Sequence, residues 1–237
     1  MALQLPPTKT GMRKLSDVAR HLILPDGIES TGWPAVRDKC AELGLTFDQW
    51  QDGAGRAILS KRSDGKYAAT VGGVAMSIPR QTGKTYLLGA IAFALCLLSP
   101  RLTVLWTAHR LKTAKETFRS MQGLAKRRKI APHVEQIFTG SGEEAIMFRN
   151  GSRIMFGARE TGFGRGFARV DIEVFDEAQI LTERALDDML PAMNASPNAL
   201  ALFTGTPPRP IDPGEVFGRM RAEAILAGSG KSDGLYI

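Results

Sequence analysis

The sequence predicts an α/β fold with a mainly parallel central sheet that is flanked by helices. Short apolar segments with strand character alternate with helical segments from about residue 71 onward. A Gly-Lys-Thr tripeptide lies between the first of these strands and the helix that follows it. Strands that alternate with helices form parallel sheets, because the connecting helices cover both faces. The 237 residues, of which 43% are hydrophobic and 23% charged, have the composition of a globular protein, which excludes a disordered chain.

The predicted elements follow one another in a regular order. A lead segment interrupted by prolines precedes two helical stretches, residues 35–43 and 48–61. The predicted strands are residues 74–77, 102–107, 146–148, 154–156, 170–175 and 200–204, and the predicted helices are residues 83–98, 113–126, 182–193 and 216–227. Asn150-Gly151 separates the third strand from the fourth and predicts a hairpin turn.

Charge, cysteine content and hydropathy narrow the functional classes. The net charge of +7 and the pI of about 9.6 favour a polyanionic partner. Cys40 and Cys96 form no CxxC pair and predict a reduced compartment without disulfides, and the three scattered histidines argue against a zinc site. Residues 1–10 contain no secretion signal, and the longest apolar run, Tyr86 to Leu98, is shorter than the roughly 20 residues that span a bilayer. We therefore expect neither secretion nor a membrane span.

A phosphate-binding loop is predicted at residues 77–85. Gly83, Lys84 and Thr85 match the end of the pattern G-x-x-x-x-G-K-[ST], whereas Ile78 stands where the first glycine belongs. The glycine lets backbone N–H groups face a phosphate, the lysine places a cation on the outer phosphates, and the threonine hydroxyl can bind Mg²⁺. Because a strand precedes the tripeptide and an apolar helix follows it, we expect ATP and Mg²⁺ to bind here.

A second match to the tripeptide serves as an internal control. Gly230, Lys231 and Ser232 have the same letters, but they follow the helical stretch 216–227 instead of a strand. Only five residues remain after them, which is too few for the required helix. We expect a flexible turn there and no phosphate site.

An acidic pair follows the strand at residues 170–175. Asp176, at the end of a neighbouring strand, can hold Mg²⁺ through its water shell, and Glu177 can polarise the water that attacks the terminal phosphate. An Asp-Glu pair is usually surface charge, but the end of an apolar strand downstream of a phosphate loop favours the catalytic role. Glu177 indicates hydrolysis and not transfer of the phosphoryl group to a metabolite. Glu173, inside the strand, predicts that one strand face is less buried.

Further segments complete a pattern known from one family. They are Phe47-Asp48-Gln49-Trp50-Gln51 ahead of the phosphate loop, Arg80-Gln81 within it, Thr107-Ala108-His109-Arg110 after the second strand, Asn150-Gly151-Ser152 in the hairpin, Gly164-Arg165-Gly166 ahead of the acidic pair, and Phe203-Thr204-Gly205-Thr206-Pro207 after the last strand. In this order, over residues 46–210, the chain resembles the large terminase subunit of tailed bacteriophages, the motor that packages DNA into preformed capsids.

The resemblance implies a lead segment, residues 1–45, and a P-loop ATPase domain, residues 46–237, of the RecA-like additional-strand type. It implies ATP hydrolysis that powers translocation of double-stranded DNA in the host cytoplasm, at the capsid portal. The implied partners are double-stranded DNA, further copies of the chain in a ring, the portal protein and the small terminase subunit. The family usually continues into an RNase H-like nuclease domain; the sequence ends at Ile237 without such an acidic cluster, so we expect no DNA cleavage by this chain.

The resemblance also assigns roles to single residues. Gln51 is expected to contact adenine, with Trp50 packing nearby, and Lys84 and Thr85 are expected to bind phosphate and Mg²⁺. Asp176 is expected to act as the metal carboxylate and Glu177 as the catalytic one. The remaining expected nucleotide contacts are the loop residues Pro79, Arg80, Gln81, Thr82 and Gly83.

Two roles beyond nucleotide binding follow from the same resemblance. Thr204, with Gly205 and Thr206, is expected to sense the terminal phosphate and couple hydrolysis to movement. Arg165 is expected to act as an arginine finger on a neighbouring subunit, with Arg159 and Arg169 as alternatives.

Two basic segments are candidates for DNA contact. His109, Arg110, Lys112 and Lys115 follow the second strand, where related translocases often touch a nucleic-acid backbone. The denser run at residues 126–129 fits a solvated helix end, where cations complement the helix dipole. A motor that moves along DNA of any sequence needs contacts with the phosphates only. The affinity for DNA should therefore fall steeply as the salt concentration rises.

Two other functions share these motifs. A helicase-like translocase has the same core, but it needs a second core domain or aromatic residues that stack on single strands, and 237 residues leave no room for another core. A nucleotide-binding scaffold without turnover is supported only by Ile78 in place of glycine. Hydrolysis that depends on Glu177 would exclude the scaffold.

Overall fold

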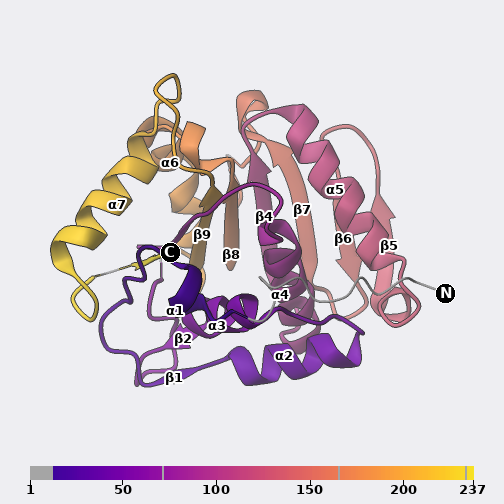
Figure 1. Ribbon diagram of the computed structural model, residues 1–237. Helices are drawn as coiled ribbons and strands as arrows, with labels where there is room; N and C mark the ends of the chain where they lie inside the picture. The colour runs from indigo at the N-terminus through magenta and orange to yellow at the C-terminus, as the bar shows by residue number, and fades with distance from the viewer. Residues whose placement is uncertain (1–12, 71, 165, 233) are drawn as a thin grey trace.

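An eight-stranded sheet forms the centre of the computed structural model, which describes residues 13–70, 72–164, 166–232 and 234–237 (Figure 1). The strands lie in the order β10-β3-β9-β8-β4-β7-β6-β5. Their bounds are β3 (Val74–Ser77), β4 (Thr103–Ala108), β5 (Val134–Phe138), β6 (Ala145–Phe148), β7 (Arg153–Ala158), β8 (Ile172–Asp176), β9 (Leu200–Gly205) and β10 (Leu235–Tyr236). Neighbours from β10 to β7 pair in parallel, and β6 and β5 continue as antiparallel strands. The predicted α/β fold is confirmed.

The strand order is that of the additional-strand type. β9 lies between β3, which leads into the phosphate loop, and β8, which ends in the acidic pair. The register aligns Thr204 of β9 with Met76 of β3 on one side and with Asp176 of β8 on the other. Because parallel strands end at the same edge, the segments that follow β3, β9 and β8 lie side by side there. The phosphate loop, Thr204 and the acidic pair therefore meet at the carboxyl edge of the sheet.

Helices cover both faces of the sheet (Figure 1). Ile172 and Val174 of β8 share one core cluster with the four helices of ten or more residues that precede β8, whereas Phe175 belongs to a second cluster with two later helices. The first four helices are α2 (Trp33–Glu42), α3 (Gln49–Ile58), α4 (Lys84–Leu98) and α5 (Leu111–Ala125), and the other two are α6 (Glu183–Met189) and α7 (Glu215–Ala227). The short elements α1 (Leu15–Val18), β1 (Ser30–Thr31) and β2 (Ser60–Lys61) precede the main sheet. No helix within the described residues is both long and apolar enough to cross a membrane.

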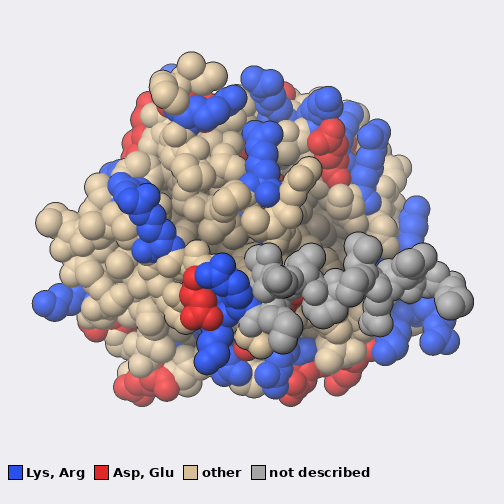
Figure 2. Space-filling model, viewed as in Figure 1, with Lys and Arg blue, Asp and Glu red and all other residues tan. Residues whose placement is uncertain are grey.

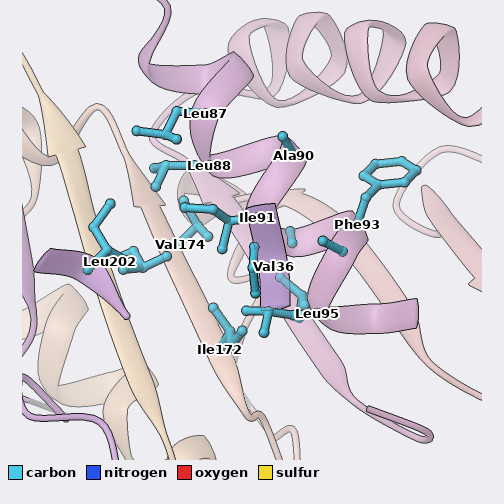
Figure 3. Packing of buried hydrophobic residues seen from close by; sticks show 14 of the residues in the cluster. Val36, Leu87, Leu88, Ala90, Ile91, Phe93, Leu95, Ile172, Val174 and Leu202 are labelled. Atoms are coloured by element: carbon cyan, nitrogen blue, oxygen red, sulfur yellow. The ribbon is translucent and has the colours of Figure 1, made fainter. Parts of the chain in front are cut away.

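Helix α4 forms the centre of the larger core (Figure 3). Ten consecutive residues from Leu87 to Cys96 are buried, as expected for a helix that is apolar on all sides. Figure 3 shows Leu88 and Ile91 on the side of α4 that faces Val174 and Leu202 of the sheet. The buried residues of α2, which belongs to the predicted lead segment, pack into the same cluster. The phosphate loop is thus attached to a rigid helix.

Four strands are absent from the predicted elements: β5 and β10 of the main sheet, and the short pair β1 and β2. The predicted helical stretch 48–61 is wrong at its end, because α3 ends at Ile58 and Ser60–Lys61 form β2. β5 carries the exposed Glu135 and Gln136 and lies at the sheet edge, so it lacks an apolar signal. β10 has two residues, which is too short for a periodic pattern, and it pairs in parallel with β3.

The segment around Lys231, between α7 and β10, is a turn and is followed by no helix, as predicted. The turn is anchored to the chain near residues 22–24. The Gly230 N–H donates to the Leu24 carbonyl oxygen at 3.0 Å, and Ser229 Oγ donates to the Leu22 carbonyl oxygen at 3.1 Å. The two tripeptides thus differ as the sequence indicated: the one at residues 83–85 lies between a strand and a helix, and the one at residues 230–232 does not.

Glu173 lies in the middle of β8 with 0% of its surface exposed. The prediction of a less buried strand face is therefore wrong. Neither carboxylate oxygen has a hydrogen-bond partner within the described residues. Burial raises the pKa of Glu173 to about 8, although the positive charge of Arg159 lowers it. The carboxyl group is tolerated there because it is mostly protonated at neutral pH.

We expect the Glu173→Gln variant to gain stability over the wild type as the pH rises. The pKa of Glu173 is raised from an ordinary value of 4.5 to about 8 in the fold. The contribution of this group to stability is therefore complete below pH 4.5 and is lost as the pH rises through 8. Between about pH 5 and about pH 9, the free energy of unfolding of the wild type should fall by up to ~4 kcal/mol relative to the variant, as measured with urea.

The matched control is Glu135→Gln on the exposed edge strand, which should keep the pH dependence of the wild type. Parallel pH profiles for the wild type and Glu173→Gln would contradict the raised pKa.

Candidate nucleotide site at the carboxyl edge of the sheet

The loop between β3 and α4 has the backbone that a phosphate cradle requires. Gly83, directly before α4, has a φ of +96°, which residues with a side chain rarely adopt. A Cβ at this position would lie 2.7 Å from Nε2 of Gln51, so a larger residue would also displace the end of this side chain. Gln81 also has a positive φ, of +61°. The loop then enters the N-terminus of α4, where unpaired N–H groups and the helix dipole favour an anion.

Ile78, in place of the first glycine, fits this loop. It is not among the described residues that have a positive φ. Its N–H donates to the Gly205 carbonyl oxygen at 3.2 Å, and its side chain packs against the main core. The position therefore needs no glycine, which removes the one feature that favoured a scaffold without turnover.

Lys84 begins α4 and its ammonium group turns back into the loop. Nζ donates to the carbonyl oxygens of Ile78 at 2.7 Å and Pro79 at 2.6 Å. Burial lowers the pKa of Lys84, the Asp176 carboxylate raises it, and Arg80 lowers it. The lysine is thus close enough to the end of β8 to interact with the acidic pair, and its protein partners are neutral carbonyls.

Gln51 and Trp50 bring α3 to the same loop. Gln51 Oε1 accepts from the Asp48 N–H at 2.9 Å, and Nε2 donates to the Gly83 carbonyl oxygen at 3.3 Å. The oxygen of the amide thus caps the start of α3, and its nitrogen holds the loop against this helix. Trp50 lines a cavity of about 590 Å³ beside the loop, a size typical of small-ligand sites. Its lining includes the predicted contacts Pro79, Gln81 and Thr82.

The acidic pair lies where β8 ends. Asp176 Oδ1 accepts from the Glu177 N–H at 2.9 Å, and burial raises the pKa of Asp176. Glu177 has a φ of +55°, a conformation uncommon for a residue with a side chain. Its Oε1 accepts from Thr113 Oγ1 of α5 at 3.2 Å, while Oε2 is shielded from solvent and has no partner within the described residues. Strained backbones of this kind concentrate at functional sites.

Thr204 lies level with Asp176, on β9 between β3 and β8. Its side chain is 1% exposed, and Oγ1 has no hydrogen-bond partner in the described part of the chain. A buried hydroxyl without a partner costs free energy, so its presence beside the phosphate loop indicates a ligand or water as partner.

The residues after Thr204 connect three segments of the site. Gly205 accepts from the Ile78 N–H of the phosphate loop, and the Thr206 N–H donates to Gln179 Oε1 at 3.4 Å. A Cβ on Gly205 would lie 2.3 Å from that same oxygen. The end of β9 is therefore in contact with the phosphate loop on one side and with the segment after the acidic pair on the other.

Arg159 is held inside the subunit, at the ends of β7, β4 and β8. Its guanidinium donates to the Thr107 carbonyl oxygen at 3.0 Å, to Thr107 Oγ1 at 3.2 Å and to the Asp176 carbonyl oxygen at 2.7 Å. Burial lowers the pKa of Arg159 to about 10, although nearby carboxylates raise it. These bonds give Arg159 a structural role in positioning the acidic pair.

The other two candidates for the arginine finger are Arg169 and Arg165, and the structure describes only Arg169. Arg169 is exposed and pairs with Asp171, which precedes β8, at 3.5 Å; it lies at the amino edge of the sheet, opposite the phosphate loop. Arg165 lies outside the described residues.

The residues that could hold Mg²⁺ are few. Within the described residues, no group of three or more His, Cys, Asp or Glu side chains forms a metal site. Thr85 lies in the first turn of α4, and Asp176 faces the same edge. Mg²⁺ in nucleotide sites is typically bound by one or two protein oxygens together with substrate phosphates and water. A hydroxyl and a single carboxylate therefore fit a nucleotide-bound Mg²⁺.

Sequence reasoning missed Thr113 and Gln179. A single threonine at a helix start and a glutamine after an acidic pair have no spacing that distinguishes them from surface residues. Gln179 follows Glu177 by two residues, so a search for polar side chains near the acidic pair would have found it. Thr113 is brought to Glu177 only by the pairing of β4 with β8.

Comparisons with known proteins were made by sequence and by structure. No protein-family model matches the sequence, and no curated protein matches it. The large terminase of bacteriophage HK97 is similar in structure, with a TM-score of 0.65 and 16% identity over 83% of this chain and 42% of that chain. The chain therefore spans less than half of the HK97 protein.

Two structures of the large terminase ATPase domain of Thermus phage P74-26, one of them a mutant, are also similar. The mutant has a TM-score of 0.56 and 13% identity over 73% of this chain and 70% of that chain. The other has a TM-score of 0.52 and 17% identity over 70% and 67%. At these identities the likeness establishes the fold. The chain has the fold of large terminase ATPase domains from tailed phages.

Proposed function

We propose that the chain hydrolyses ATP at the carboxyl edge of its sheet. The observation that carries this proposal is the alignment of Thr204 with Met76 and with Asp176 across three parallel strands. This alignment brings the phosphate loop, a buried hydroxyl and the acidic pair together at one edge. The Asp176 carboxylate raises the pKa of Lys84, which is consistent with a cation and an acidic group at the same edge of the sheet.

In the proposed reaction, a water oxygen attacks the terminal phosphorus, the bond to the ADP oxygen breaks, and the proton of the water passes toward Glu177. Lys84 stabilises the charge on the outer phosphates, and Thr204 donates its free hydroxyl toward the terminal phosphate. Thr85 and Asp176 would hold Mg²⁺, which neutralises charge on the phosphate oxygens. The backbone N–H groups around Gly83 bind the phosphates, as expected at a helix N-terminus.

We propose the cavity beside Trp50 as the site of the adenine ring. It adjoins the phosphate loop through Pro79, Gln81 and Thr82. Gln51 already bonds to the loop through its amide, so an adenine contact would require this amide to exchange a partner. Arg80 is part of the phosphate loop and lowers the pKa of Lys84 through its charge, so we propose that it also acts on the phosphates.

We propose further that hydrolysis powers movement of double-stranded DNA into a capsid, as part of a large terminase. The shared fold and the net charge of +7 support this proposal. A ring of copies, with a portal protein and a small terminase subunit as further partners in the host cytoplasm, belongs to the same proposal. Thr204, Gly205 and Thr206 would couple hydrolysis to movement, since the end of β9 contacts both halves of the site.

We expect Glu177→Ala to lower the rate of ATP hydrolysis by roughly 10² to 10⁴, because a positioned general base contributes about that factor. Binding of a fluorescent ATP analogue should be retained, since Glu177 acts on the water. Lys84→Ala is the contrasting variant and should lose nucleotide binding as well. Turnover that survives Glu177→Ala would contradict the proposed reaction. Chelation of Mg²⁺ with EDTA should abolish turnover in the wild type.

We expect Arg165 to act on the site of a neighbouring subunit, and a mixing experiment tests this. Arg165→Ala and Glu177→Ala should each be inactive alone, because a finger contributes roughly 10³ or more to the rate. Mixed together, they should recover part of the wild-type turnover, since a Glu177→Ala subunit still supplies the arginine to an intact acidic pair next to it. The absence of recovery, with each protein folded by circular dichroism, would contradict a finger that acts between subunits.

A further inference from the structure

Buried polar groups lie on both sides of Asp176, one on each neighbouring strand. On β9, Thr204 has a hydroxyl without a partner in the described part of the chain, and the proposed reaction uses it for the terminal phosphate. On β4, Trp106 has an indole N–H that is shielded from solvent and has no hydrogen-bond partner within the described residues. Because only 1% of Trp106 is exposed, bulk water does not reach this donor. Buried donors are nearly always paired, so this N–H needs an acceptor that the fold brings close to it.

The register of the sheet places Trp106 next to the Asp176 carboxylate. Trp106 pairs with Val174 of β8, and Asp176 follows Val174 by two residues, so the side chains of Trp106 and Asp176 lie on the same face of the sheet. Neighbours on adjacent strands that are offset by two residues are within reach of an aromatic side chain. On its other side, Trp106 stacks on Phe156 of β7 with the ring centroids 6.3 Å apart, and Phe156 packs against Phe118 of α5. The indole is thus supported by the strand and the helix on that side.

The pKa of Asp176 indicates that the indole and the carboxylate interact. Burial is the largest influence and raises this pKa, whereas the backbone N–H of Glu177 and the indole N–H of Trp106 lower it. The charge of Glu177 raises it and the charge of Arg159 lowers it. A donor that lowers the pKa of a carboxyl group stabilises the charged form. The N–H of Trp106 is therefore close enough to favour the carboxylate that a metal ion requires.

An indole N–H differs from the cations that surround this edge of the sheet. Figure 2 shows Lys and Arg side chains gathered along the upper margin of the molecule, where β4 ends and α5 begins in Figure 1. Within the described residues, none of them forms an ion pair with Asp176. A cation paired with Asp176 would compete with a metal ion, whereas an indole N–H is a neutral donor that orients a carboxylate without cancelling its charge. Trp106 can therefore hold Asp176 in place and leave its charge free for Mg²⁺.

We propose that Trp106 is a positioning residue for the metal carboxylate, and that its indole N–H donates to Asp176 when Mg²⁺ and nucleotide bind. Trp106 acts through Asp176 and does not bind the ion itself, because an indole N–H is a donor only. The Glu177 N–H already donates to Oδ1 of Asp176 at 2.9 Å, so one donor from the backbone and one from β4 would fix the carboxylate. The inference rests on the proposed ATPase function and adds a residue outside the motifs that the sequence displays.

The first test is Trp106→Phe, which keeps an aromatic ring against Phe156 and removes the N–H. The affinity for a fluorescent ATP analogue is measured with Mg²⁺ and again with EDTA, and the ratio of the two affinities is the gain from the metal. This gain should fall roughly 10-fold, because losing the partner of a metal ligand costs about that factor or more in metal affinity. The affinity in EDTA should stay as in the wild type, since Asp176 then has no ion to hold.

The matched control is Trp33→Phe, which also removes an indole N–H from an aspartate. Trp33 Nε1 of α2 donates to Asp52 Oδ1 of α3 at 2.7 Å, and neither residue belongs to the proposed site. This variant should keep the wild-type gain from Mg²⁺. Trp106→Phe combined with Asp176→Asn should lower the gain no further than Asp176→Asn alone. A further loss in the double variant would show that the indole acts through packing, and it would overturn the inference.

The second test needs no substitution of Trp106. The chain has three tryptophans, so a ¹⁵N-labelled protein should give three indole signals, which Trp33→Phe and Trp50→Phe assign. When Mg²⁺ is added to the protein with a non-hydrolysable ATP analogue, the indole proton of Trp106 should shift downfield, as expected for a new hydrogen bond to a charged acceptor. This shift should be lost in Asp176→Asn. A Trp106 signal that does not respond to Mg²⁺ in the wild type would overturn the inference, even if Trp106→Phe fails to fold.

The outcomes separate this inference from the ATPase proposal. A wild type that binds the analogue no better with Mg²⁺ and does not hydrolyse ATP would overturn the proposed function. A wild type that does both, together with a Trp106→Phe variant that keeps the full gain from Mg²⁺, would overturn the inference alone.

Discussion

The register between three parallel strands is the constraint on which the rest of the structure depends. Thr204 of β9 lies level with Met76 of β3 and Asp176 of β8, so the segments that leave these strands are forced to the same edge. A shift by one residue would turn Asp176 to the other face, because side chains alternate along a strand. The apolar helix α4, buried over ten consecutive residues, holds the phosphate loop at this edge. The site is therefore a consequence of how the sheet is assembled.

On the face of the sheet opposite α4, Arg159 and Glu173 affect how the end of β8 is held. Arg159 bonds to the carbonyl oxygen of Asp176 and to Thr107, and so ties the ends of β7, β4 and β8 together. Glu173 lies buried on the same strand as Asp176 and interacts with Arg159 through its charge. Its raised pKa keeps it mostly neutral, which leaves Arg159 available to the main chain of the acidic pair. A fully charged Glu173 would compete for that guanidinium.

Most of the fold followed from the sequence because the parallel strands and α4 are apolar runs with clear boundaries. β5 escaped prediction because an edge strand with Glu135 and Gln136 exposed has no apolar pattern. The loop between β3 and α4 and the acidic pair at the end of β8 lie where the sequence indicated, because each follows an apolar strand; their roles in binding phosphate and metal stay predictions. The contacts of Thr113 and Arg159 depend on which strands become neighbours, a property of the tertiary fold that no local pattern records.

The two charged groups proposed for catalysis are both held by the protein itself. Lys84 donates to two carbonyl oxygens of its own loop, and Glu177 accepts from Thr113. Partly buried charges need such partners, since a charge without one is costly to desolvate. A phosphate can compete for Lys84 directly, because an anion is a stronger acceptor than a neutral carbonyl. Glu177 has the same sign of charge as a phosphate, so a phosphate cannot take the place of its hydroxyl partner in this way. A bound phosphate can therefore displace the protein partners of Lys84 but not the partner of Glu177.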